Sequence, residues 1–182
     1  MRFRRLAAGT AVLVGVTMVL GIFTAAAGAG LTCQMRWPLC DGPLGGLFPA
    51  NWPSFIEWFH RLVAGATGLP VLATAIQSWR TDQSSRVRYA STAVLAILPI
   101  QVVLGALTVT QYGIAVLFAH FATPVLLFTL STLTAAWAYE SGVSAVTGRR
   151  AALLALPFLA LAGLLSPRFL VTFTAPIQVV YN

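Results

Sequence analysis

Long apolar runs dominate this chain of 182 residues and limit what it can fold into. Four of them, at about residues 6–28, 55–78, 89–110 and 114–139, reach the length of about 20 residues with which an α-helix crosses a hydrocarbon core. Only 8% of the residues are charged, against about 25% in a typical soluble domain. The sequence therefore predicts an all-α integral membrane protein and excludes an ordinary soluble enzyme.

The order of the runs predicts the domain organisation. We expect an antiparallel four-helix transmembrane bundle in residues 1–139, followed by a fifth span and a tail in residues 140–182. The fifth apolar stretch, 151–165, is short for a crossing and reaches residue 174 only with a bend at Pro167. The first run follows three arginines and so also has features of a secretory signal peptide, but its length favours a retained span.

All eleven basic residues are arginines, and the formal net charge is +7. They are scattered in ones, twos and threes between apolar runs, a pattern typical of topology signals rather than of a nucleic-acid interface. Eight of them fall at one end of the expected bundle: Arg2, Arg4, Arg5, Arg80, Arg86, Arg88, Arg149 and Arg150. The positive-inside rule places this end, with the N-terminus, on the cytoplasmic side of a prokaryotic cell membrane. The loop of residues 30–54 then lies outside the cytoplasm.

His60 and His120 are the only histidines. We expect them on the second and fourth spans, which both run from the outside inwards. Each lies about six or seven residues into its span, so a rise of 1.5 Å per residue places both rings roughly 9–10 Å below the outer surface. Facing histidines in a bundle core can be the two axial ligands of a haem iron. The sequence therefore predicts a bis-histidine haem site.

Two simpler interpretations of the histidines stay open. Membrane histidines also form hydrogen bonds between helices without binding any cofactor. Zinc is less favoured, because a closed zinc site takes four ligands and only Glu57 could join the pair.

Glu57 lies three residues before His60 and four residues before Arg61, so the three side chains share one helix face. One interpretation is a local ion pair that neutralises two costly charges within the membrane. The other is functional: Arg61 meets a haem propionate and Glu57 lies beside the ring. The spacing alone does not separate them.

Cys33 and Cys40 both lie in the outer loop. Outside the cytoplasm they can form a structural disulfide, or a reversible dithiol that exchanges electrons. Pro124 is a further local feature, because a proline leaves the carbonyl four residues earlier, that of His120, without its helical donor.

Five segments together resemble the haem A synthase family. They are Gly28-Ala29-Gly30-Leu31-Thr32-Cys33, Trp37-Pro38-Leu39-Cys40-Asp41-Gly42, Glu57-Trp58-Phe59-His60-Arg61, residues 101–109 and Ala119-His120-Phe121. The resemblance covers residues 6–139. It implies a membrane oxidoreductase of haem biosynthesis and cytochrome oxidase assembly, which oxidises the C8 methyl group of haem O to the formyl group of haem A. The usual member has eight spans in two similar halves, and this chain resembles the N-terminal half.

The resemblance also implies roles for residues and partners. His60 and His120 would hold the iron of haem O, or of haem B as another possible ligand, while Glu57 acts at the methyl group and Arg61 contacts a propionate. Without a second half, electrons would go to another subunit or to the Cys33/Cys40 pair. We therefore expect a homo-oligomer or a partner haem protein, and contact with the synthase that makes haem O.

Two other functions remain as alternatives. A non-catalytic bis-histidine cytochrome b would carry electrons through one haem, but it has no need of Glu57. A quinone-linked disulfide oxidoreductase also uses outer cysteines, but it normally needs a second redox pair, and this chain has two cysteines in total.

Overall fold

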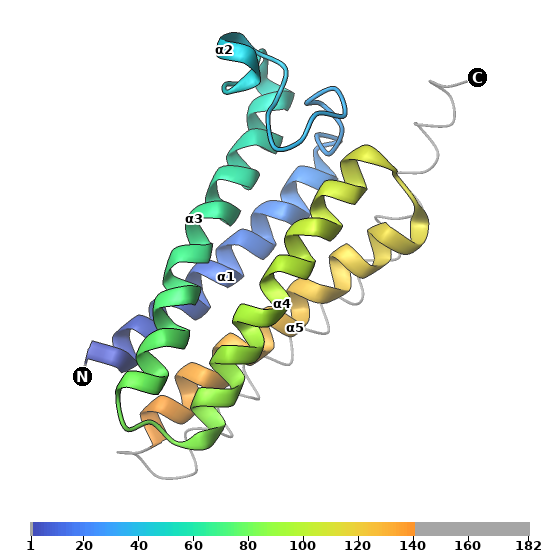
Figure 1. Cartoon of the computed structure of the whole chain (residues 1–182). Coiled ribbons are helices and arrows are strands. Elements are labelled where there is room, and N and C mark those ends of the chain that lie inside the picture. The colour runs from blue at the N-terminus through green and yellow to red at the C-terminus, as the bar shows by residue number, and fades with distance from the viewer. Residues whose placement is uncertain (1, 141–182) are drawn as a thin grey trace.

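Four long helices make up most of the protein (Figure 1). The computed structural model describes residues 2–140, and its long helices are α1 (Arg2–Ala26), α3 (Trp52–Arg80), α4 (Ser85–Thr110) and α5 (Ile114–Glu140). Each is long and apolar enough to cross a membrane, and no strand occurs among the described residues. The prediction of an all-α membrane bundle is confirmed. The fifth span predicted at 151–165 lies outside the described residues.

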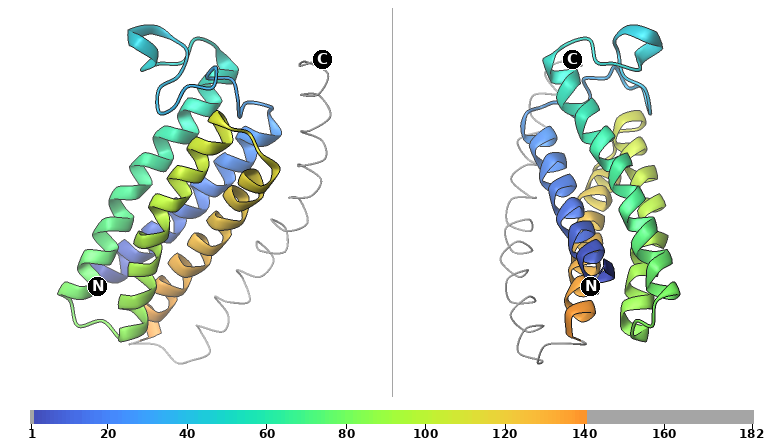
Figure 2. Two further views of the ribbon diagram at one scale, coloured as in Figure 1. Left: turned by 45° about the vertical axis from the view of Figure 1, so that its right-hand side comes forward. Right: turned by 90° about the vertical axis from the view of Figure 1, so that its left-hand side faces the viewer.

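The helices form a closed ring in which each packs along two neighbours. Helix α1 contacts α3 and α5, and α4 contacts the same two helices. Consecutive long helices run in opposite directions, as Figures 1 and 2 show. The two histidine-bearing helices, α3 and α5, are therefore parallel and lie diagonally across the bundle.

The start of α3 is fixed by a cap. The side chain of Asn51 accepts a hydrogen bond from the backbone N–H of Ser54 at 3.0 Å, which satisfies one of the donors left free at a helix N-terminus. Pro53 follows in the first turn, where its missing N–H costs nothing. This cap fixes the start of α3 and thereby the position of its three candidate site residues, Glu57, His60 and Arg61.

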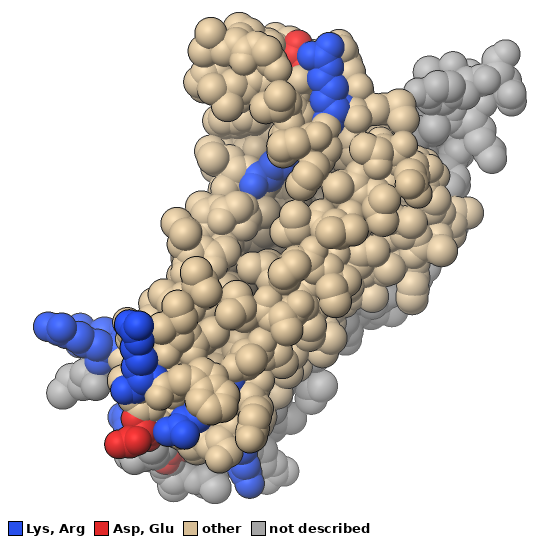
Figure 3. Space-filling model, viewed as in Figure 1, with Lys and Arg blue, Asp and Glu red and all other residues tan. Residues whose placement is uncertain are grey.

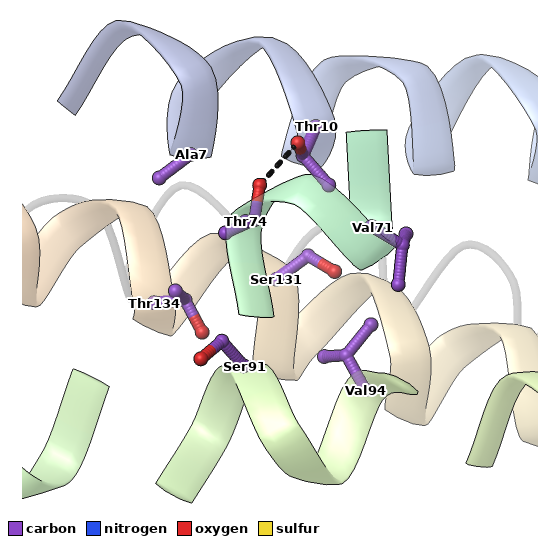
Figure 4. A pocket seen from close by; sticks show the side chains of 8 residues that line it. All are labelled: Ala7, Thr10, Val71, Thr74, Ser91, Val94, Ser131 and Thr134. Atoms are coloured by element: carbon purple, nitrogen blue, oxygen red, sulfur yellow. Dashed lines mark hydrogen bonds between the residues drawn. The ribbon is translucent and has the colours of Figure 1, made fainter. Parts of the chain in front are cut away.

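The half of the bundle farthest from the long loop is packed with small hydroxyl residues (Figure 4). Thr10 and Thr74 share a hydrogen bond of 2.8 Å between α1 and α3. Ser91 donates to Ser78 at 2.9 Å between α4 and α3. The cavity among them has a volume of only about 10 Å³. Small polar residues of this kind let membrane helices approach closely and bond to one another, so this half has no room for a large ligand.

Charge is distributed unequally between the two ends (Figure 3). Arginines gather where α1 begins, where α3 ends and where α4 begins, and the end that carries the long loop has few. We call the latter the loop end.

Candidate functional site

The segment between α1 and α3, residues 27–51, covers the loop end of the bundle (Figure 2). Its only regular element is the single turn α2 (Pro43–Gly46). Cys33 and Cys40 are joined in a disulfide with their Cα atoms 4.4 Å apart, and both residues are fully buried. The structure therefore has the pair in its bonded form.

Asp41, next to the disulfide, holds the second part of this segment in place. Its carboxylate accepts hydrogen bonds from the backbone N–H of Ala50 at 3.0 Å and from the hydroxyl of Ser54 at 2.8 Å. The N–H of Ala50 is the main reason that the pKa of Asp41 lies below its usual range. The ionised carboxylate thus ties the segment to the first turn of α3.

Glu57 connects the helix to the disulfide. It is buried, with 3% of its surface exposed. Its Oε2 atom accepts from the backbone N–H of Cys33 at 2.9 Å and from the hydroxyl of Thr32 at 3.2 Å, and its Oε1 atom pairs with the guanidinium of Arg61. A buried carboxylate needs such partners, and here they come from both the helix and the loop.

Arg61 is partly buried and donates to the same loop. Its Nη1 atom donates to the carbonyl oxygens of Arg36 at 2.9 Å and Leu39 at 2.8 Å. The local ion pair with Glu57 is therefore present, and the guanidinium also fastens the segment that contains the disulfide. These contacts use only part of its five N–H donors.

His60 lies against a glycine of the neighbouring helix. A Cβ atom placed on Gly21 of α1 would be 3.0 Å from Cε1 of the imidazole, a distance that real side chains do not tolerate without a shift. The Nδ1 atom of the ring is buried and has no hydrogen-bond partner among the described residues. The ring is thus positioned by packing rather than by a hydrogen bond.

His120 has an equivalent glycine and, in addition, a polar partner. A Cβ atom on Gly105 of α4 would be 3.2 Å from Cε1 of His120. Gln101, one turn earlier on α4, places its Nε2 atom 3.1 Å from Nδ1 of the ring and donates to the backbone carbonyl of His120 at 3.2 Å. This is the carbonyl that Pro124 leaves without a helical donor.

The two histidine sites are related by an internal repeat. The pattern Val-Leu-Gly-x-x-Thr occurs at 19–24 on α1 and again at 103–108 on α4, and its glycine contacts a histidine each time. Sequence reasoning missed Gly21, Gly105 and Gln101 as site residues. This repeat was the signal that could have identified the glycines, and an amide in an apolar span was the signal for Gln101.

The donor set fits a haem iron. The two imidazoles come from α3 and α5, which are parallel and lie diagonally across the bundle. Each histidine lies within the first third of its helix. Two buried polar atoms beside them, Nδ1 of His60 and Oε1 of Gln101, have no partner in the described part of the chain. A histidine that binds a metal through one ring nitrogen generally uses the other for a hydrogen bond. For His120 the acceptor of that bond would be Oε1 of Gln101, since the amide of Gln101 already contacts Nδ1 of the imidazole.

Comparison with known proteins gives one family. The family of cytochrome oxidase assembly proteins, COX15-CtaA, matches residues 47–174 of the chain. No solved structure is significantly similar.

The curated relatives have two different names. A protoheme IX farnesyltransferase of Halobacterium salinarum is 38% identical over 125 residues, which are 68% of this chain and 28% of the relative. One of Haloarcula marismortui is 36% identical over 139 residues, 76% of this chain and 29% of the relative. A haem A synthase of Bacillus licheniformis is 32% identical over 127 residues, 68% of this chain and 41% of the relative. The chain therefore spans less than half the length of these relatives.

Proposed function

Because the chain belongs to the haem A synthase family of cytochrome oxidase assembly proteins, we propose that it binds haem O and takes part in oxidising the C8 methyl group to a formyl group. The observation that carries the proposal is the pair of glycine-flanked histidines, His60 and His120, on parallel diagonal helices. The network that joins Glu57 to the disulfide loop supports it.

The relatives support farnesylated haem as the ligand. Similar segments occur in proteins named for transferring a farnesyl group to protohaem and in proteins named for making haem A. A ligand common to both activities is the farnesylated haem, which is the product of the first reaction and the substrate of the second. Contact with the farnesyl-transferring enzyme is the corresponding proposal for a partner.

The substrate's own iron would be held by His60 and His120, so both axial positions are filled. Since the reacting carbon lies on the edge of the ring, filled axial positions do not obstruct it. Glu57, one turn before His60 on α3, is our candidate for the group at the methyl carbon, where a carboxylate stabilises developing positive charge and orients a water molecule. Arg61 remains our candidate for a propionate contact through donors that the loop does not use.

The overall conversion takes one methyl group and one water molecule to one formyl group, releasing four protons and four electrons in two two-electron steps. We propose a haem of a partner subunit, or of a second copy of this chain, as the electron acceptor. The disulfide is a second candidate, because the backbone of Cys33 bonds directly to Glu57. A bis-histidine cytochrome without oxidase activity remains the alternative function, with the same ligands and no reaction at Glu57.

The arginine distribution supports a topology. We propose that the arginine-rich end, with the N-terminus, lies in the cytoplasm of a prokaryotic cell and that the disulfide loop lies outside it.

The test is haem extraction and mass analysis after co-expression with a source of haem O. The proposal predicts haem A with the wild-type chain and only haem O with the Glu57→Gln variant, which keeps the shape of the side chain and removes its charge. Haem A in equal amounts from both would remove Glu57 from the reaction. Bound haem B or haem O that is never converted, even with the partner proteins present, would favour the cytochrome.

A further inference from the structure

The small cavity in the half of the bundle remote from the loop end is enclosed by all four long helices (Figure 4). Each helix contributes two lining residues three positions apart, which therefore share a helix face: Ala7 and Thr10, Val71 and Thr74, Ser91 and Val94, and Ser131 and Thr134. All eight are at most 4% exposed. We call it the hydroxyl cavity.

The lining is polar for the interior of a membrane bundle. Every helix supplies at least one hydroxyl group to it: Thr10, Thr74, Ser91, Ser131 and Thr134. Thr134 donates to the carbonyl oxygen four residues earlier on its own helix, and Ser91 donates to the carbonyl of Arg88 or to Ser78. A hydroxyl oxygen has two lone pairs besides its one hydrogen, so these residues can still accept hydrogen bonds.

Ser131 is the exception among them. It is buried, with 3% of its surface exposed, and its Oγ atom has no hydrogen-bond partner among the described residues. Figure 4 shows this hydroxyl pointing into the space among the other lining side chains. A buried hydroxyl without a partner is costly in an apolar environment. The side chain therefore needs a group within the cavity that can bond to it.

The size and charge of the cavity restrict what that group can be. Its volume of about 10 Å³ corresponds to one water molecule, which needs about 10–15 Å³ and makes about three hydrogen bonds when buried. Ser131 offers a donor, and the hydroxyl groups of the neighbouring helices offer acceptors. No charged residue of the described chain lines the cavity, so a metal cation would have no balancing charge there.

We propose that the hydroxyl cavity binds one water molecule, which links Ser131 of α5 to hydroxyl groups of the neighbouring helices. Ser131 lies about three turns beyond His120 on the same helix, with Pro124 between them. The water therefore fastens the histidine-bearing helix to the rest of the bundle at the end remote from the histidines. The site needs no haem and does not depend on the proposed function.

The test combines thermal unfolding of two variants with a crystal structure that shows ordered water. Ser131→Ala removes one partner of the water, and we expect the unfolding midpoint to fall by about 2–4 °C, the shift usual for one hydrogen bond in a chain of this size. Thr129→Val is the matched control. Its hydroxyl donates to the carbonyl of Val125 at 2.7 Å on the same helix and does not line the cavity, so its loss should leave the midpoint nearly unchanged. The wild-type structure should show a density peak about 2.8 Å from Oγ of Ser131 and from a hydroxyl of another helix.

Three results would contradict the proposal. A higher midpoint in Ser131→Ala would mean that the hydroxyl is unpartnered in a dry cavity. Equal midpoints in the two variants, with Ser131 turned toward the carbonyl of Leu127 and no density peak, would give the hydroxyl a partner within its own helix. A peak about 2.3–2.6 Å from several oxygen atoms would identify a cation instead of water.

Discussion

At the scale of single residues, the two histidines are held in different ways. Both pack against a glycine, but within residues 2–140 only His120 has a polar partner, since Gln101 contacts its Nδ1 atom and its backbone carbonyl. In the structure the amide nitrogen faces Nδ1. Ligation of iron through Nε2 leaves the proton on Nδ1, so we expect the amide to turn and present Oε1, which has no partner among the described residues. If His120 binds the iron as we propose, Gln101 is a positioning residue for this ligand.

Removing this amide should weaken the site without removing a ligand. Gln101→Leu is expected to lower haem B affinity about 10- to 100-fold, the usual cost of losing a partner of a metal-bound histidine. It should also shift the reduction potential of the bound haem, which a merely structural residue would not do. Gln77→Leu, at an exposed glutamine of α3, is the control. Unchanged affinity and potential in Gln101→Leu would exclude the positioning role.

The glycine beside His60 should be equally sensitive. A valine at Gly21 would collide with the imidazole, because even its Cβ atom lies 3.0 Å from Cε1. We expect Gly21→Val to abolish haem binding or leave a haem with a single histidine ligand, as measured by absorption spectra of the reduced protein. Gly9→Val is the matched control on the same helix, since nothing lies within 4 Å of its Cβ position. Normal spectra from Gly21→Val would contradict the assigned packing.

At the scale of elements, the loop of residues 27–51 and the start of α3 act as one unit. Asp41 accepts a hydrogen bond from the N–H of Ala50, and Glu57 accepts one from the N–H of Cys33. Arg61 donates to two carbonyl oxygens of the loop. The disulfide lies within this set of bonds and further restricts the conformations that the loop can adopt. The bonds of Glu57 and Arg61 join loop backbone to side chains of α3, and Asp41 also accepts from the hydroxyl of Ser54 in the first turn of α3. Disorder in the loop is therefore expected to reach Glu57.

This coupling predicts a pH dependence. The folded-state pKa of Asp41 is lowered, so its contribution to loop order is present above the unfolded value of about 3.9 and disappears as the pH falls through the folded value. Hydrogen exchange of the loop, corrected for intrinsic rates, should therefore increase as wild type is acidified from about pH 6 to 3. Asp41→Asn should exchange faster already at pH 6. Asp82→Asn, at the opposite end of the bundle, should resemble the wild type, and equal protection in both variants would exclude the carboxylate as the cause.

At the scale of the whole molecule, length and apolarity were sufficient to predict the four long helices, because backbone hydrogen bonding in a bilayer leaves few alternatives to a helix. The ends differ in detail: α1 begins at Arg2 and α3 at Trp52, a few residues before the apolar runs, since a helix continues into the polar interface. The Glu57–Arg61 pair could also be predicted, because its spacing is local.

What the sequence alone did not give depends on distant segments meeting. The bond from Cys33 to Glu57 depends on how the loop folds back, and the contacts of Gln101 and Gly21 depend on which helices are neighbours. No periodicity within a single segment encodes these pairings.

The central claim, that one haem is held between α3 and α5 by His60 and His120, is tested most directly by electron paramagnetic resonance of the oxidised protein loaded with haem B. We expect a six-coordinate low-spin haem in the wild type. His60→Ala and His120→Ala should each convert it to a high-spin haem with one histidine ligand, or lose it. A low-spin signal that persists unchanged in both single variants would contradict the account, because a chain with only these two histidines would then hold the iron with other residues.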